Sequence, residues 1–194
     1  MTLPNQLTVI RILLIPVFVL LLVYDERGSA LIVFLLTGIS DSLDGFIARA
    51  WKQETQLGTI LDPIADKLLI VTSFVTLTVL KAIPFPLAVL LISRDVILSL
   101  VFGIVLWITG RRLAAPTALG KAASCAQMST VVLGLFFYVF DDRAVFSSLR
   151  PFLLTPVFII TAVLAIVSAL HYFYHLARLC SMIEEPIKPQ RTLL

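Results

Sequence analysis

Long apolar runs alternate with short polar breaks along the whole 194-residue chain. Each run approaches the ~20 residues that a helix needs to cross the hydrocarbon core of a bilayer. The runs are continuous, whereas the strands of a membrane barrel alternate polar and apolar residues over ~10 positions. The breaks contain charges, glycine and proline, which are typical of turns. The pattern predicts an all-α bundle of six transmembrane helices, over Leu7–Tyr24, Ala30–Trp51, Gly58–Leu80, Phe85–Trp107, Ala118–Phe140 and Phe152–Tyr174.

The composition supports a membrane protein and excludes two other classes. Hydrophobic residues make up 59% of the chain and charged residues 14%, and the mean hydropathy is +1.03. A soluble domain has roughly 45–50% apolar and about 25% charged residues, and a disordered chain is low in hydrophobicity and high in charge. We therefore expect one membrane domain over residues 1–180 and a cytoplasmic tail over residues 181–194.

The distribution of lysine and arginine predicts the orientation of the bundle. Six spans place both termini on the same side of the membrane, and the segments on that side hold nine of the fifteen basic residues. The other side holds four, and two lie within spans. Because cytoplasmic loops carry the excess of positive charge, both termini are predicted to be cytoplasmic. The net charge of +3 also suits contact with anionic lipid.

Five of the twelve acidic residues lie inside or beside apolar spans, namely Asp41, Asp44, Asp62, Asp66 and Asp95. A charge at the centre of a membrane helix costs at least ~2.5–3.5 kcal/mol, so such residues indicate a functional site. Spacings of three and four residues place the first two acids on one helix face and the next two on another. Four carboxylates that converge need cations, and oxygen ligands suit two Mg²⁺ or Mn²⁺ ions, which act on phosphorus chemistry.

The residues around these acids fit a phosphate site. Gly45 and Gly58 allow a ligand to approach the backbone closely, although Gly45 is also the kind of small residue that packs helices together. Arg49 offers bidentate contact to a phosphate, or it extends to the lipid headgroups as an interfacial anchor.

The segment Asp41-Ser-Leu-Asp-Gly-Phe-Ile-Ala-Arg49, followed by Gly58, Asp62 and Asp66, resembles the signature of the CDP-alcohol phosphotransferase family at each of its eight fixed positions. The resemblance implies transfer of a phospho-alcohol group from a CDP-linked donor to an acceptor hydroxyl, with release of CMP. It also implies two divalent cations, Mg²⁺ or Mn²⁺, and a homodimer. By position it implies metal ligands at Asp41, Asp44, Asp62 and Asp66, with Asp66 as general base, and donor contacts from Gly45, Ala48, Arg49 and Gly58.

A second resemblance lies at the start of the first predicted helix. The segment from Pro4 to Arg11 is similar to the one that opens the first helix in family members using CDP-diacylglycerol. This implies that Asn5 and Thr8, with Arg11, line the nucleotide site. The alternative is that Asn5 caps the helix and that Arg11 is an interfacial anchor.

Basic residues in or beside the later spans are candidates for binding the acceptor. Arg94 lies in the fourth span, Arg111 follows that span and Lys121 opens the fifth, so we predict that these three hold an acceptor phosphate. Two alternatives stay open: Arg94 pairs locally with Asp95, and Lys121 is an anchor that extends to the headgroups.

Two branches of the family differ in their acceptor. Phosphatidylglycerophosphate synthases use glycerol 3-phosphate and often show Arg-Glu followed by an arginine eight residues later. Here the pair is Arg94-Asp95 and the later position is Phe102, and the segment from Ser93 to Val96 resembles cardiolipin synthases, whose acceptor is phosphatidylglycerol. Glycerol 3-phosphate is the first candidate, because that branch is common among bacterial chains of this size, and phosphatidylglycerol is the alternative.

A transporter and a non-catalytic scaffold are the two alternatives to an enzyme. A cation or proton transporter would also contain intramembrane acids, but its sites lie near the midplane and often within inverted repeats, whereas these acids flank a loop. A non-catalytic scaffold would not need a complete set of metal ligands. The sequence therefore predicts an enzyme of phospholipid biosynthesis in a bacterial inner membrane, with its active site facing the cytoplasm.

Overall fold

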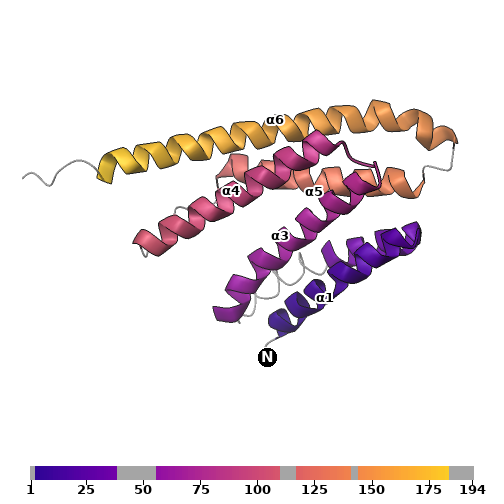
Figure 1. Ribbon diagram of the computed structural model, residues 1–194, viewed down its shortest axis with the longest axis horizontal. Coiled ribbons are helices and arrows are strands. Elements are labelled where there is room, and N and C mark those ends of the chain that lie inside the picture. Colours follow the sequence, from indigo (N-terminus) through magenta and orange to yellow (C-terminus); the bar gives the residue numbers. More distant parts are fainter. Residues whose placement is uncertain (1–2, 39–55, 110–116, 141–143, 184–194) are drawn as a thin grey trace, which may run out of the picture.

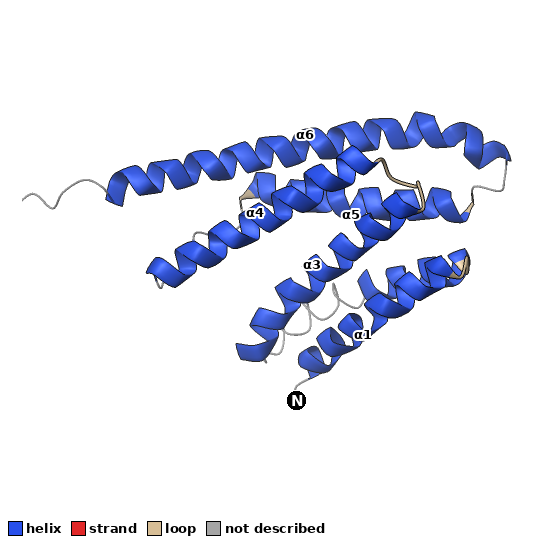
Figure 2. Ribbon diagram, in the orientation of Figure 1, coloured by secondary structure: helices blue, strands red, loops and turns tan. Residues whose placement is uncertain are grey.

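The computed structural model describes residues 3–38, 56–109, 117–140 and 144–183; within them, residues 3–7, 56–63, 105–109, 144–148 and 175–183 are described by their backbone alone. Every regular element in these ranges is a helix, as Figure 2 shows, which confirms the predicted all-α class. The helices are α1 (Leu3–Val23), an unlabelled helix over Arg27–Gly38, α3 (Gln56–Val79), α4 (Phe85–Thr109), α5 (Ala118–Val139) and α6 (Ala144–Ile183).

Three of these helices are long and apolar enough to cross a membrane within the part of the chain that is described. The qualifying segments are Phe85–Ile104, Ala118–Val139 and Leu149–Tyr174. They coincide with the fourth, fifth and sixth predicted spans to within a few residues. Helix α3 also begins and ends within two residues of its predicted bounds.

Helix α6 differs from the prediction because it begins at Ala144 rather than Phe152. The predicted span leaves Pro151 just outside its first residue, but the helix continues through both Pro151 and Pro156. Membrane helices tolerate proline where neighbouring groups satisfy the freed backbone carbonyl. At 40 residues, α6 is about 60 Å long, twice the ~30 Å hydrocarbon core. Its last residue, Ile183, lies within the segment predicted as the tail.

Helix α3 lies in the middle of the bundle, where it packs against α1, α4 and α5. Helix α6 runs along α4 and α5 on the other side (Figure 1). Helices α1 and α3 begin at the end of the bundle marked N in Figure 1, and α4 and α6 end there. We call this the N-terminal end; the turn between α3 and α4 lies at the opposite end.

The buried face of α6 is small and polar, and its exposed face is bulky and apolar. Thr161, Ala165 and Ser168 follow each other at helical spacing and are almost completely buried. The Thr161 hydroxyl lies 2.8 Å from the Thr130 hydroxyl of α5. Isoleucine, valine and leucine side chains cover the outer face, at Ile159, Ile160, Val163, Ile166, Val167 and Leu170. Small residues at helix contacts and an apolar exterior are the arrangement of a membrane protein.

Tyr172 joins three helices near the N-terminal end. Its hydroxyl accepts a hydrogen bond from the backbone N–H of Thr117, at 3.3 Å. Its ring meets Phe102 of α4 edge to face, with 5.6 Å between ring centroids. Gly120 of α5 lies against the hydroxyl end of this ring, and a Cβ atom at Gly120 would lie 3.2 Å from two ring carbons and closer still to the hydroxyl oxygen.

We expect Gly120→Ala to destabilise the fold by about 1–3 kcal/mol, the usual cost of an overpacked contact. The Tyr172 ring cannot move without weakening its contacts with Thr117 and Phe102. Gly103→Ala is the matched control, because a Cβ there meets nothing within 4 Å and alanine favours the helix. Thermal unfolding in detergent measures both, and Tyr172→Phe should restore part of the loss in the Gly120 variant. Equal stability of the two alanine variants would contradict the contact.

Candidate functional site

An ion pair between α1 and α3 forms the centre of the candidate site. Nη1 of Arg11 donates to Oδ1 of Asp66 at 2.8 Å. The Arg11 side chain is 3% exposed, whereas the Asp66 side chain is 46% exposed. A buried guanidinium needs a counterion, so the pair fixes the position of a carboxylate that is itself about half exposed. Asp66 is the residue for which the motif resemblance predicts the role of general base.

The structure describes the other predicted metal ligands and substrate-binding residues in different detail. Asp62 precedes Asp66 by four residues in α3 and so shares its helix face. Thr8 precedes Arg11 by three residues in α1 and is buried. Only the helical backbone is described for Asn5, Gly58 and Asp62, while Asp41, Asp44, Gly45, Ala48, Arg49 and Arg111 lie outside the described residues. The four-carboxylate cluster therefore stays a prediction.

Asp66 has the chemistry expected of a ligand to a hard cation. Its carboxylate is half exposed, and carboxylate oxygens are the ligands that Mg²⁺ and Mn²⁺ prefer. Among the side chains that the structure describes, no three of His, Cys, Asp and Glu come together as a metal site. Three of the four predicted ligands fall outside that set. What is described, one accessible oxygen donor and a predicted ligand one turn away, fits the implied ions.

A second polar cluster lies inside the bundle, centred on the buried carboxylate of Asp95. Oδ1 accepts from Nη1 of Arg94 at 2.6 Å. Oδ2 accepts from Nε2 of Gln127 and lies near Nζ of Lys67, each at 3.2 Å. Nη2 of Arg94 donates to the Ser168 hydroxyl at 2.7 Å. The cluster thus connects α3, α4, α5 and α6 around one anion.

This cluster bears out the local pairing that the sequence left as an alternative for Arg94. The guanidinium is buried, and two of its nitrogens bond within the protein. Sequence reasoning passed over Lys67, which it counted only as a basic residue within a span. A usable signal was present, since a lysine inside an apolar span next to a motif aspartate is costly unless it has a role.

The other acceptor candidates differ in exposure. Lys121 is exposed in the first turn of α5. The position where the sequence comparison expected a second arginine is Phe102, whose ring contacts Tyr172. Of the acceptor residues whose side chains are described, Lys121 alone presents an exposed charge.

The chain is similar in sequence to curated proteins that are named as enzymes of phospholipid synthesis. The chain is 46% identical over 121 residues to the human protein named cardiolipin synthase (CMP-forming), a match covering 62% of this chain and 39% of that protein. It is 36% identical over 138 residues to a putative cardiolipin synthase of Mycobacterium bovis, covering 69% and 66%. It is 39% identical over 104 residues to a CDP-diacylglycerol–glycerol-3-phosphate 3-phosphatidyltransferase of Haemophilus influenzae, covering 50% and 55%.

The matched part spans about two fifths of the human relative and about half of the Haemophilus relative. A family model has broader coverage of this chain, because the one described as CDP-alcohol phosphatidyltransferase matches residues 1–172. That range contains both motifs, the Arg11–Asp66 pair and the Asp95 cluster. The resemblance drawn from eight motif residues is confirmed, and the chain belongs to the CDP-alcohol phosphatidyltransferase family.

Proposed function

We propose that this protein transfers the phosphatidyl group of CDP-diacylglycerol to the hydroxyl of a glycerol-type acceptor and releases CMP. The observation that carries the proposal is the Arg11–Asp66 pair. It holds a half-exposed carboxylate at the last position of the family motif. Such a carboxylate is accessible to a substrate hydroxyl and is fixed in direction, as a general base must be.

In the proposed reaction, Asp66 takes the proton of the acceptor hydroxyl. The acceptor oxygen then attacks the phosphorus that carries diacylglycerol, and the bond from this phosphorus to the CMP phosphate breaks. Arg11 keeps the Asp66 carboxylate oriented throughout. The family generally depends on divalent cations. When held by Asp41, Asp44, Asp62 and Asp66, these would neutralise the donor pyrophosphate and the departing CMP.

Phosphatidylglycerol is the acceptor that the described residues favour, which would make the product cardiolipin. A dianionic, water-soluble acceptor such as glycerol 3-phosphate calls for free cations at its phosphate. Here Arg94 is buried against Asp95 and Ser168, and the second cation position is Phe102. The human and mycobacterial relatives carry names that point to the same product.

Glycerol 3-phosphate, the first candidate from the sequence, remains the second candidate here. The name of the Haemophilus relative specifies that acceptor. The exposed ammonium of Lys121 is a cation that a soluble phosphate would reach from water.

The proposal extends to the setting of the protein. The predominance of basic residues on one side supports cytoplasmic termini and an active site facing the cytoplasm. Long apolar helices and lipid-synthase relatives make it a membrane protein. A bacterial inner membrane and a homodimer complete the proposal.

Product identification tests the function directly. Purified protein with CDP-diacylglycerol and Mg²⁺ or Mn²⁺ is given phosphatidylglycerol, glycerol 3-phosphate, inositol phosphate or serine in separate reactions. We expect CMP release and cardiolipin in the first reaction, detected by mass spectrometry, and loss of both on chelation. If the only product were phosphatidylglycerophosphate, formed in the second reaction, the acceptor would be glycerol 3-phosphate rather than phosphatidylglycerol. Ion flux through reconstituted protein without CMP release from any reaction would refute the enzyme.

A further inference from the structure

The Asp95 cluster holds more positive charge than negative charge. Arg94 and Lys67 both contact the Asp95 carboxylate, at 2.6 Å and 3.2 Å, whereas Gln127 and Ser168 contribute neutral groups. The cluster also has more donors than acceptors, because the buried Nε of Arg94 has no hydrogen-bond partner among the described residues. A charge without a counterion inside an apolar span is costly, so two cations around one carboxylate indicate a place for a further anion.

Lys67 is the cation of this cluster that an incoming anion can reach. The Arg94 side chain is 7% exposed, and its charge is matched by the short contact with Asp95. The Lys67 side chain is 43% exposed. An ammonium group has three N–H donors, and the contact with Asp95 accounts for one of them. The remaining donors can therefore bind a ligand that approaches from the exposed side.

The position of Lys67 in α3 relates it to the acceptor rather than to the donor. Lys67 follows Asp66 directly, and successive residues of a helix point about 100° apart. Asp66 contacts Arg11 of α1, whereas Lys67 contacts Asp95 of α4. Helix α1 also carries Thr8, one of the residues predicted to line the nucleotide site. If the donor occupies the α1 side of Asp66, the α4 side, where the Lys67 ammonium lies, is left for the acceptor.

We propose that Lys67 binds the phosphodiester of the acceptor phosphatidylglycerol, while the reacting hydroxyl of the same molecule meets Asp66. This inference rests on the proposed function and names the residue that recognises the acceptor's charge. The glycerol unit between the phosphate and the terminal hydroxyl lets one molecule reach two neighbouring residues. A phosphodiester carries one negative charge, which equals the surplus of the cluster. Glycerol 3-phosphate carries close to two at neutral pH, so its second charge would lack a cation here.

Steady-state kinetics with each substrate varied separately test this contact. Lys67→Gln should raise the KM for phosphatidylglycerol about tenfold or more, the effect of losing a hydrogen bond between charged groups. It should leave kcat and the KM for CDP-diacylglycerol largely unchanged. Lys67→Arg keeps a cation and should recover most of the loss. Two results would overturn the proposal: an unchanged acceptor KM with lower stability, which would make Lys67 a structural partner of Asp95, or a rise in the KM for the donor instead.

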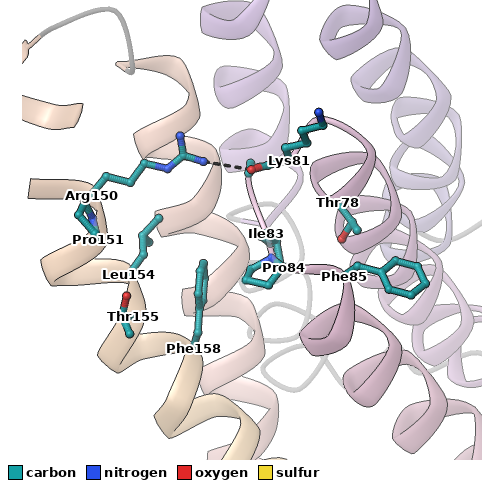
Figure 3. A pocket seen from close by; sticks show the side chains of 11 residues that line it. Thr78, Lys81, Ile83, Pro84, Phe85, Arg150, Pro151, Leu154, Thr155 and Phe158 are labelled. Atoms are coloured by element: carbon teal, nitrogen blue, oxygen red, sulfur yellow. Dashed lines mark hydrogen bonds between the residues drawn. The ribbon is translucent and has the colours of Figure 1, made fainter. Parts of the chain in front are cut away.

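Lys81→Gln is the matched control. Lys81 lies in the turn between α3 and α4 (Figure 3), at the end of the bundle opposite the N-terminal end, and it is exposed. Its backbone carbonyl accepts a hydrogen bond from Nη2 of Arg150 at 3.3 Å, and a change of side chain keeps that carbonyl. Both KM values should stay as they are. An equal rise in the acceptor KM for the Lys67 and Lys81 variants would contradict a specific site, because any surface cation would then attract the anionic lipid.

The charge can also be removed from the acceptor, without any change in the protein. Phosphatidylglycerol methylated on its phosphate keeps its hydroxyls and acyl chains but is neutral. We expect the unsubstituted protein to show a KM for it about tenfold higher, or no turnover, and Lys67→Gln to distinguish the two lipids much less. Equal KM values in the unsubstituted protein would overturn the inference alone, even if the Lys67 variants failed to fold. No CMP release with any acceptor would instead refute the proposed function, and this inference with it.

Discussion

Asp66→Asn is expected to lower the rate of CMP release by at least the ~10²–10⁴-fold that a general base contributes. An amide cannot take the acceptor proton, and it is a poorer ligand for a divalent cation than a carboxylate. The fold should survive, because the amide oxygen can still accept the hydrogen bond that Nη1 of Arg11 donates at 2.8 Å. Binding of CDP-diacylglycerol should be largely retained. Steady-state CMP release and a donor-binding measurement on the same preparation check both parts.

Two companion variants separate chemistry from charge balance. Asp25→Asn makes the same change in another ion pair, since Asp25 bonds Arg27 at 2.6 Å on an exposed surface, and it should leave turnover unchanged. The double variant Arg11→Gln/Asp66→Asn removes both members of the buried pair. If Asp66 served only to neutralise Arg11, the double variant would regain activity. A general base predicts that it stays inactive, and wild-type turnover in Asp66→Asn would refute the role outright.

The helices could be predicted from the sequence because the bilayer restricts what an apolar run can form. With no water to bond the backbone, a segment such as Phe85–Thr109 has to satisfy its own peptide groups as a helix. The start of α6 was harder to predict, since proline and nearby charges resemble a break and only the neighbouring helices decide whether the helix continues.

In the candidate site too, the sequence predicts what lies within one helix but not the contacts between helices. The spacing of Asp62 and Asp66 follows from one helix, so the sequence is sufficient to place them on one face. The partner of Asp66 is Arg11, 55 residues earlier, and that contact depends on how α1 packs against α3. Spacing along the chain carries no information about such packing.

The Asp95 cluster is a second case in which contacts between helices could not be predicted from the sequence. The adjacency of Arg94 and Asp95 made a local pair one of two open alternatives. The contribution of Lys67, Gln127 and Ser168 comes from three other helices. An acid inside an apolar span signals that compensating groups must exist, but it does not identify the helices that supply them.

Asp95→Asn is expected to be the most destabilising conservative substitution in the described part of the chain, at about 3–5 kcal/mol, the cost of removing one partner from a buried ion pair. The side chain is 2% exposed, and the change leaves two cations, Arg94 and Lys67, without their anion. For a chain of this size the loss corresponds to a fall of about 10 °C or more in the unfolding temperature. The fraction of protein that stays monodisperse in detergent after heating measures it.

Asp25→Asn serves again as the control, because asparagine tolerates the left-handed backbone of Asp25 and an exposed pair is worth at most ~1 kcal/mol.

Arg94→Met/Asp95→Leu removes both buried charges and should recover most of the stability, since the half-exposed Lys67 can extend to water. The double variant then tests the two interpretations of Arg94. A folded protein with an unchanged KM for the acceptor would identify the pair as structural, whereas a raised KM would show that Arg94 contacts the acceptor. A double variant as unstable as Asp95→Asn would contradict the view that an uncompensated charge causes the loss.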